Sequence, residues 1–403
     1  MLYSCAMEKP AGAGGKPVRT SYLVFGSPRI EEPEIQEVVD TIRSGWIGTG
    51  PKVKVFEKQF RDFIGCRHAC AVNSCTAALH LSMLASGVGV GDEVITTPMT
   101  FPATSNAVIH TGATPVFADV DPRTMNIDPD EIEKKITSRT RAIIPVHFAG
   151  RPCEMERIMQ IADSRDLLVI EDCAHSIESR IDGQATGTFG QLGCFSFYVT
   201  KNVITGEGGM VTTGSDELAE TVKVMALHGM TKDAWHRFSD QGYKHYQVVE
   251  AGFKYNMTDI QASFGIHQLP RVEQYHQRRS QIWRRYDNAF QNLACRTPAP
   301  ERPENVHAFH LYTLLLDLDR LTIGRDEFLD ALDREHIGVG VHYLPVHLHP
   351  YYRKRMGYGP GDFPHAEDIG KRTVSLPLSA KLSDQDVDDV IQAVSKILSW
   401  YLR

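Results

Sequence analysis

From about residue 56 to residue 229, short β-branched runs alternate with stretches of helical periodicity. Strands joined by helices of this length are typical of a largely parallel sheet covered on both faces. The runs predicted as strands are His68–Asn73, Glu93–Thr97, Pro115–Asp119, Ala142–His147, Leu167–Asp172, Gln191–Tyr198 and Met210–Thr213. The helices predicted between them are Thr76–Ser86, Ala103–His110 and Met155–Asp163. Such sheets bind ligands at the carboxyl ends of their strands, so we expect functional side chains there.

A second region of alternating pattern begins near residue 258. Helical periodicity over Thr258–Leu293 is interrupted only by Pro270, which predicts a kinked helix bridging two domains. Ser383, with Asp386 three positions later, predicts the capped start of a terminal helix. Between these helices the pattern predicts strands at His310–Leu316 and Val339–Tyr343 and a helix at Asp326–Glu335.

These patterns predict an α/β protein in three parts. Residues 1–20, with lysine, proline and a glycine-rich stretch, are expected to form a flexible tail. Residues 21–265 are expected to form a large ligand-binding domain with a mostly parallel central sheet. The long linking helix and a smaller C-terminal α/β domain would occupy residues 266–403.

Composition narrows the class of protein. The chain has 403 residues and a formal net charge of -7. The protein as a whole is not basic, which argues against nucleic acid as its main partner. No apolar run is long enough to span a bilayer, and residues 1–19 lack the apolar centre of a secretory signal. The eight cysteines form no C-x-x-C pair, which favours reduced thiols. We therefore expect a cytoplasmic protein without a membrane partner.

One candidate for chemistry is the carboxylate that ends the run Val169-Ile170-Glu171-Asp172, followed by His175. An aspartate at the carboxyl end of a strand faces the ligand side of the sheet. In an enzyme that uses pyridoxal 5'-phosphate (PLP), such an aspartate pairs with the pyridine nitrogen and keeps it protonated. A helix N-cap or a surface carboxylate pair is the simpler alternative.

Lys201 follows another apolar strand and precedes a loop containing Gly206, Gly208 and Gly209. A lysine that attacks an aldehyde must lie in a desolvated pocket, where its amine is neutral. Glycines allow the backbone to pass close to a bound group. The alternative is an ordinary surface lysine before a turn.

A third candidate is the turn Asn73-Ser74-Cys75-Thr76, where a strand leads directly into a helix. Unsatisfied backbone N–H groups and the positive end of the helix dipole make such a turn an anion site. Ser74, Cys75 and Thr76 could therefore hold a cofactor phosphate, although a plain N-cap has the same appearance. No G-x-x-x-x-G-K-[ST] sequence is present, so this is not a P-loop.

In this order, the three features resemble the DegT/DnrJ/StrS family of sugar aminotransferases. The resemblance extends from Ser44-Gly45-Trp46 to the final helix. The matching stretches are Asn73–Leu79, Thr100–Thr104, Gly112–Phe117, Glu171–His175, Lys201–Gly209, Gly252–Ala262 and Val341–His347. It implies a PLP enzyme of fold type I, with a large domain like that of aspartate aminotransferase.

The resemblance also implies a role for each matching residue. PLP would be bound covalently to Lys201, which would act as general base and acid, and pyridoxamine phosphate would be the aminated form. Asp172 would pair with the pyridine nitrogen, and His175 would lie near the ring hydroxyl. Phe101 would stack on the ring, unless it is a core phenylalanine. Ser196, Cys75 and Thr76 would contact the phosphate.

Three positions depart from the usual family pattern. Cys75 stands where the family usually has glycine. Lys254 and Asn256 replace asparagine and arginine, at the place where a neighbouring subunit completes the phosphate site and a homodimer shares its active sites. Lys254 can serve the phosphate as a point charge. The residue that would hold the carboxylate of the amino donor is left open.

The Lys-Tyr-Asn sequence at 254–256 looks like the branch that acts on carbon 4 of UDP-sugars, such as the aminoarabinose enzyme. His228-Gly229-Met230 and Asp233-Ala234-Trp235 point to the same branch. His342, Tyr343 and His347 match the segment that overhangs the substrate. Metal binding by His342, His347 and His349 is a competing interpretation, but it lacks a fourth ligand, and no metal is expected.

The function implied is transfer of an amino group from L-glutamate, or from glutamine, to a nucleotide-linked keto-sugar. Amination of a cyclitol or another ketone remains an alternative on the same fold. A non-catalytic regulatory homologue that binds PLP is a second alternative, of a different class. The presence of Lys201 disfavours the dehydratase relatives, which carry histidine there.

Overall fold

The structure is a computed structural model that describes residues 8–231 and 246–403. Its centre is a seven-stranded sheet in the order β1-β9-β8-β5-β4-β2-β3. The neighbours from β8 to β3 are parallel, whereas β9 is antiparallel to both β1 and β8. The strands are β1 (His68–Val72), β2 (Glu93–Thr96), β3 (Thr114–Phe117), β4 (Thr140–Ile144), β5 (Leu168–Asp172), β8 (Leu192–Ser196) and β9 (Gly209–Thr213). The predicted mostly parallel α/β sheet is confirmed.

Helices cover both faces of this sheet because successive strand residues point to opposite sides. Ile170 and Cys194 point to one face, whereas their neighbours Val169 and Phe195 point to the other. The first face packs against α3 (Cys75–Ala85), α4 (Pro102–His110) and α7 (Asp216–Ala226). The second face packs against α2 (Pro51–Ile64), α5 (Pro129–Lys135), α6 (Met155–Arg165) and α8 (Asp259–Gln268).

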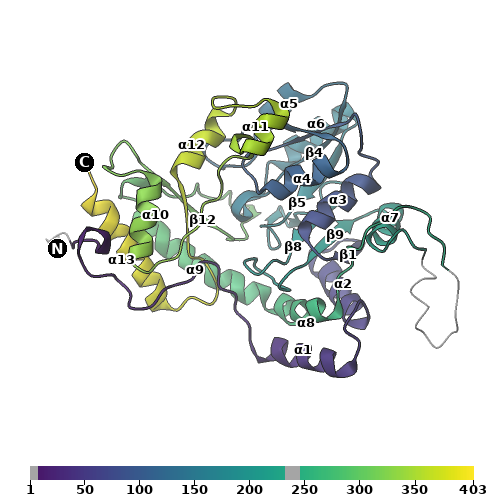
Figure 1. Cartoon of the computed structure of the whole chain (residues 1–403), viewed down its shortest axis with the longest axis horizontal. Helices are drawn as coiled ribbons and strands as arrows, with labels where there is room; N and C mark the ends of the chain where they lie inside the picture. Colours follow the sequence, from purple (N-terminus) through teal and green to yellow (C-terminus); the bar gives the residue numbers. More distant parts are fainter. Residues whose placement is uncertain (1–7, 232–245) are drawn as a thin grey trace.

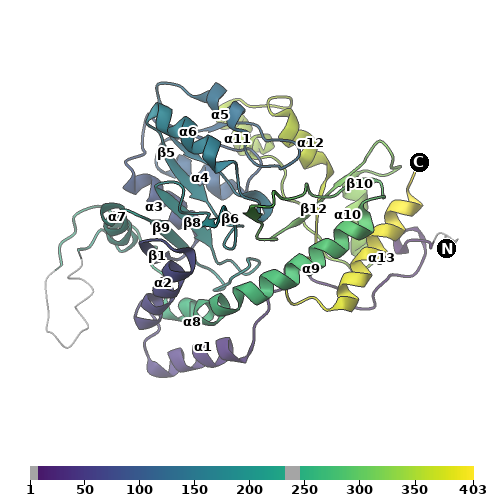
Figure 2. The same ribbon diagram turned by 180° about the vertical axis from the view of Figure 1, so that it is seen from behind.

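One long helical run joins the large sheet to a smaller domain (Figures 1 and 2). α8 continues through the 3₁₀ turn Leu269–Arg271, at the predicted site of Pro270, into α9 (Val272–Phe290). The smaller domain is an antiparallel sheet of β10 (Cys295–Arg296), β12 (Tyr312–Leu316) and β13 (Thr373–Leu376), with α10 (Arg325–Arg334) and α13 (Asp384–Trp400). Ser383 and Asp386 form the predicted capping box of α13.

Shorter elements complete the described chain. α1 (Glu32–Ser44) packs beneath α8, and α12 (Pro364–Arg372) lies near α5 of the large domain (Figure 1). The others are α11 (Pro350–Met356), β6 (Arg180–Ile181), β7 (Gln184–Ala185), β11 (Asn305–Val306) and the 3₁₀ turns Ala11–Ala13, Phe148–Gly150 and Val346–Leu348. None of the described helices is long and apolar enough to cross a membrane.

The described part of the N-terminal segment packs against the smaller domain. The backbone N–H groups of Ala11 and Val18 each donate to a carboxylate oxygen of buried Glu335, at 2.8 Å. The ammonium of Lys396 donates to the same carboxylate at 3.1 Å. Residues 8–20 therefore differ from the expected flexible tail. The reason is a contact between residues 324 positions apart, which local composition cannot reveal.

The strand predicted at Val339–Tyr343 does not form. Gly340 alone pairs with Ser375, through an isolated bridge to β13. On its other side, a Cβ added to Gly338 would lie 2.8 Å from the carbonyl oxygen of Leu23. The segment is held between β13 and the N-terminal segment by single contacts instead of a continuous ladder, so this prediction is wrong.

Candidate active site

Asp172 is the last residue of β5 and is buried at the carboxyl end of the parallel sheet. Its Oδ2 accepts a hydrogen bond from the Thr104 hydroxyl at 2.9 Å, and its Oδ1 accepts one from the Ala174 N–H at 3.1 Å. Burial raises the pKa of this carboxyl, while the two hydrogen bonds oppose the shift. The carboxylate is thus fixed in one orientation with little access to water.

Lys201 lies in the turn that follows β8, the strand next to β5. Its N–H donates to the Tyr198 carbonyl at 2.8 Å, which closes the turn. Burial lowers the pKa of its ammonium group to about 8, although Cys75 and Asp172 act in the opposite direction. Within the described chain, its Nζ makes no hydrogen bond or ion pair. A lysine in this setting has a substantial neutral fraction near neutral pH.

The glycines after Lys201 bring two parts of the site together. Gly206 has φ +80°, a left-handed conformation that favours glycine. A Cβ added to Gly209 would lie 2.5 Å from the carbonyl carbon of Ser74. Gly209 pairs with Ser196, the last residue of β8. Ser196 and the start of α3 are therefore close neighbours, as the predicted phosphate site requires.

The start of α3 has the donors that an anion needs. The Ser74 hydroxyl caps the helix by accepting from the Ala77 N–H at 3.1 Å. The N–H groups of Cys75 and Thr76 have no acceptor among the described residues, and they lie at the positive end of the helix dipole. The Cys75 thiol points back toward the Cys194 carbonyl, at 3.6 Å. Its side chain therefore leaves the turn open, and this donor set fits a phosphate group.

His175 lies among other aromatic side chains, including Tyr343 and His310. Its Nδ1 accepts from the Ala149 N–H at 3.3 Å, so the neutral ring carries its proton on Nε2, which lies 3.3 Å from the Tyr343 hydroxyl. His310 stacks against it with a centroid distance of 4.4 Å. Burial lowers the pKa of His175 well below its ordinary value, and Lys201 adds to the effect. His175 is therefore a neutral hydrogen-bonding group at neutral pH.

Two of the three predicted substrate residues, His342 and Tyr343, lie near Lys201. Tyr343 lies between His175 and exposed Phe101, with 6.3 Å between the Phe101 and Tyr343 ring centroids. His342 contacts the Ser375 hydroxyl through Nδ1 at 2.8 Å, and burial, aided by Lys201, lowers its pKa to about 4. These residues lie around the Lys201 turn, where a substrate could reach them.

His347 differs from this expectation. Its side chain is fully buried, its Nε2 lies 3.1 Å from the Glu367 carboxylate, and its ring packs against Phe363. A side chain without exposed surface cannot contact a substrate unless the fold rearranges. The structure therefore places His347 in the packing of α12 against the large domain, and no substrate contact is supported. His342, His347 and His349 do not belong to the group of described side chains that lie close enough together to share a metal ion.

Lys254 and Asn256 lie next to the start of α3. The Lys254 carbonyl accepts from the Asn73 amide at 3.4 Å, but its exposed ammonium makes no hydrogen bond or ion pair with the described residues. The Asn256 amide donates to the Thr49 hydroxyl at 2.6 Å, and its Oδ1 is buried without a partner in the described part of the chain. Asp233–Trp235, which suggested the carbon-4 branch, lies outside the described residues.

Sequence reasoning missed a network behind Lys201. Asn202 Oδ1 accepts a hydrogen bond from His310 Nδ1 at 3.0 Å, and the Asn202 amide N–H₂ donates to Glu178 at 2.8 Å. Glu178 also pairs with buried Arg279 of α9. The position of Asn202 directly after Lys201 was a usable signal. His310 and Arg279 had none, because they join the site from distant parts of the chain. Thr104 was also missed, although it lies in a stretch that carries the family resemblance.

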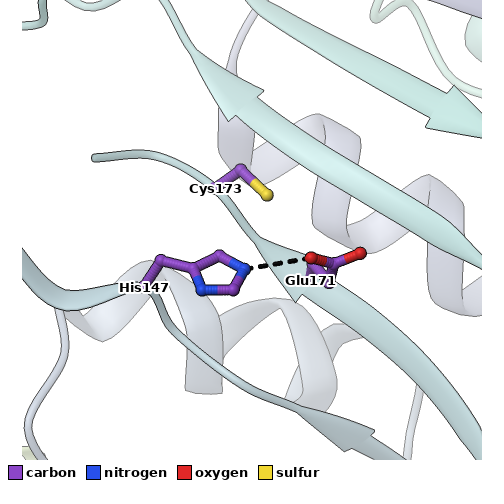
Figure 3. A group of neighbouring side chains, drawn as sticks. All are labelled: His147, Glu171 and Cys173. Atoms are coloured by element: carbon purple, nitrogen blue, oxygen red, sulfur yellow. Dashed lines mark hydrogen bonds and ion pairs between the residues drawn. The ribbon is translucent and has the colours of Figure 1, made fainter. Parts of the chain in front are cut away.

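A second buried group lies beneath the site, formed by His147, Glu171 and Cys173 (Figure 3). In the described chain these are the side chains close enough together to share a metal ion. However, His147 Nδ1 accepts from the Cys153 N–H at 3.0 Å, so its Nε2 carries a proton and donates to Glu171, also at 3.0 Å. Burial raises the pKa of the Cys173 thiol well above its ordinary value. We therefore interpret the group as a structural network.

A lysine and an aspartate at adjacent strand ends, beside an anion-binding turn, place this protein in the class of PLP-dependent aminotransferases. The chain belongs to the DegT/DnrJ/EryC1/StrS aminotransferase family, whose model matches residues 28–395. Enzymes of this family depend on PLP, and the donor set at the start of α3 fits its phosphate. PLP is thus the cofactor, as predicted.

Individual relatives agree with this assignment. The chain is 51% identical to the uncharacterized protein MJ1066 of Methanocaldococcus jannaschii, over 95% of this chain and 99% of that one. It is 49% identical to the spore coat polysaccharide biosynthesis protein SpsC of Bacillus subtilis, over 94% and 98%. Among solved structures, it resembles the putative sugar aminotransferase Spr1654 from Streptococcus pneumoniae in its PMP-form, with a TM-score of 0.88 and 35% identity over 94% and 99% of the two chains. Spr1654 is also known in a PLP-form.

Proposed function

We propose that this protein transfers an amino group from L-glutamate, or from glutamine, to the keto carbon of a nucleotide-linked sugar, with carbon 4 as the site of amination. The observation that carries the proposal is the partly buried Lys201, with its lowered pKa, beside buried Asp172 at the next strand end. The similarity to SpsC and to Spr1654 supports a sugar as the acceptor.

Different residues of the site would bind different parts of the cofactor. The N–H groups of Cys75 and Thr76, with the hydroxyls of Ser74 and Ser196, would hold the phosphate. Asp172 would pair with the ring nitrogen, and Lys201 would provide the covalent attachment. When bound, PLP supplies an electron sink that stabilises negative charge on the substrate carbon.

Lys201 would move the proton. Because burial lowers its pKa to about 8, the amine accepts a proton from a substrate carbon and returns it without a large energetic cost. Asp172 would remain ionised opposite a positive ring nitrogen, since its hydrogen bonds from Thr104 and Ala174 favour the charged form. His175 would donate its Nε2 proton to a nearby oxygen without changing its own charge.

The acceptor would lie against Phe101, His342 and Tyr343. Phe101 is 61% exposed, which is unusual for a phenylalanine at the mouth of a buried site and suits stacking on a flat ring. Tyr343, whose ring lies 6.3 Å from that of Phe101, and His342 offer polar atoms nearby. We place the protein in the cytoplasm, where nucleotide-linked sugars are made available to such enzymes.

The proposal includes a homodimer whose subunits share their active sites. Lys254, which would serve the phosphate of a second subunit, has an exposed ammonium that makes no hydrogen bond or ion pair with the described residues, and Asn256 lies near it. Exposed apolar side chains gather along α1 and the turn to α2, at Ile42, Trp46 and Ile47. A second copy of the chain would cover them.

Half-reaction kinetics test the proposal. The purified PLP-form would be mixed with L-glutamate, and the aminated form would then be mixed with a panel of nucleotide-linked 3-keto and 4-keto sugars. We expect the visible absorbance of bound PLP to bleach with glutamate and to return fastest with a 4-keto sugar. If the absorbance returned only with a cyclitol ketone, the proposed acceptor would be wrong. If no amino donor bleached the absorbance, the proposal that the protein is an aminotransferase would be contradicted.

A further inference from the structure

A small cleft opens beside the turn that carries Lys201. Its walls come from three separate parts of the chain, at residues 26–29, 199–204 and 378–380. Gln268 of α8 and Arg279 of α9 complete it. Lys201 itself belongs to the lining, so the cleft adjoins the turn that carries this lysine.

The charged residues that line the cleft are all basic. The charged residues of the lining are Arg29 and Arg279, Lys201 adds an amine, and no aspartate or glutamate lines the cleft. The neutral polar side chains of Ser27 and Ser379 lie on the same walls. A concave surface with this composition attracts a small anion.

Arg279 has a buried hydrogen-bond donor without an acceptor. The residue is 2% exposed, and its Nη2 binds Glu178 and the Ala308 carbonyl. Its Nε is buried and has no partner in the described part of the chain. Leaving a buried guanidinium N–H unsatisfied is unfavourable, so an acceptor supplied by a ligand would be favoured.

Arg29 also lines the cleft, and some of the N–H groups of its guanidinium already have hydrogen-bond partners. Its Nε donates to Glu31 at 2.7 Å, its Nη1 lies 3.4 Å from the Ala380 carbonyl, and its guanidinium stacks over the Tyr275 ring at 5.5 Å. Its Nη2 makes no hydrogen bond with the described residues. The stacking fixes the plane of the guanidinium and leaves one edge available.

We propose that this cleft is the subsite for a carboxylate of the amino donor, with Arg29 and Arg279 as its binding groups. The inference rests on the proposed function and adds the residues that recognise the donor. A planar guanidinium matches a carboxylate in shape and charge. In the proposed reaction the donor is the substrate defined by its carboxylates, and Lys201 in the same lining would receive the donor's proton.

Binding of glutarate tests the subsite, because this dicarboxylate has no amine and cannot react. Calorimetry on the PLP-loaded enzyme would give its dissociation constant, and the bleaching rate would give the constant for L-glutamate. Arg29→Met is expected to weaken both by roughly 10- to 100-fold, as for loss of a hydrogen bond to a charged group. Arg29→Lys should recover part of the loss. Arg284→Met is the control, because Arg284 is an exposed arginine of the same helix as Arg279 and lies outside the cleft.

Arg279 requires a variant that preserves folding, since removing its charge would leave Glu178 buried and unpaired. The double variant Arg279→Met with Glu178→Gln removes both charges, and Arg279→Lys retains them. Each should weaken glutarate binding, with a circular dichroism spectrum like that of the wild type.

Three results would overturn the subsite or separate it from the proposed function. Wild-type glutarate affinity in both Arg29→Met and Arg279→Lys would overturn it. Weakened binding of uridine diphosphate with unchanged glutarate binding would assign the cleft to the nucleotide and overturn it as well. If the wild type aminates no keto-sugar but Arg29→Met still weakens glutarate binding, the proposed function fails and the carboxylate subsite stands.

Discussion

At the scale of single residues, the charge on Asp172 depends on the few groups that hydrogen-bond to it. Burial alone would favour the protonated carboxyl, and the Thr104 hydroxyl, at 2.9 Å, is one of two donors that oppose this. A hydrogen bond to a charged acceptor contributes about 1.5–3 kcal/mol. Thr104 thus helps to keep ionised a carboxylate that must remain negative.

Replacing Thr104 by valine should therefore move the acid limb of the kcat/KM profile to higher pH. The sign follows because loss of the donor raises the pKa of Asp172 further, and only the ionised form is competent. Thr104→Ser keeps the hydroxyl and should keep the wild-type profile. An unchanged acid limb in Thr104→Val would mean that another group sets it.

Lys201 gives a second pH dependence, in which the rate again increases with pH. In the cofactor-free protein its amine reacts with the aldehyde of added PLP only when neutral, so the rate of reconstitution should rise with pH and level off above about 8. An unperturbed lysine would require about pH 10.4. Stopped-flow absorbance would measure the rate. Lys201→Ala should fold normally, lose the reaction and abolish turnover. Amination at a near wild-type rate by this variant would contradict the assigned role.

At the scale of elements, Glu171 connects the end of β5 to the loop before β8. Its carboxylate accepts from the N–H groups of Gly187, Phe189 and Gly190, at 2.8, 2.7 and 2.9 Å, and from His147. Figure 3 shows Glu171 beside His147, and the neighbouring residue in the strand is Asp172, so the same network fixes the strand end that carries the Asp172 carboxylate.

Glu171→Gln should lower the free energy of unfolding by about 3 kcal/mol, because an amide N–H₂ would face backbone donors. Urea unfolding followed by circular dichroism would measure the loss. Glu304→Gln is the matched control, since Glu304 is exposed and should change stability by less than about 0.5 kcal/mol. Equal losses for the two substitutions would show that the hydrogen bonds of Glu171 do not stabilise the fold more than an exposed glutamate does.

The elements also show what a sequence can reveal. Strands of the large sheet were predictable because parallel strands are buried on both faces and read as continuous apolar runs. Asp172 and Lys201 were predictable because each ends such a run. The segment at 339–343 was misleading, since Val339 packs against one hydrophobic cluster and Tyr343 against another. His347 belonged to a stretch that resembles the family, yet only the packing against Phe363 shows that its side chain is buried.

At the scale of the whole molecule, the apolar strip of Ile42, Trp46 and Ile47 on the outer side of α1 and its following turn needs an explanation. A second copy of the chain would cover it and complete the phosphate site. Ile47→Asp should therefore shift the protein from dimer to monomer in light scattering and weaken PLP retention. Val90→Asp is the control, because Val90 is 90% exposed in a different turn. A dimer that survives Ile47→Asp with full PLP content would place the interface elsewhere.

The attachment of residues 8–20 to Glu335 and Lys396 has a consequence for the order of events during translation. The large sheet uses residues 68 to 213, so it can assemble while the rest of the chain is still being synthesised. The smaller domain differs, because residues 8–20 meet their buried carboxylate only after some 324 further residues have been synthesised. Contacts between such distant residues form late, so we expect the smaller domain to fold more slowly than the large sheet and to be exposed to aggregation for longer.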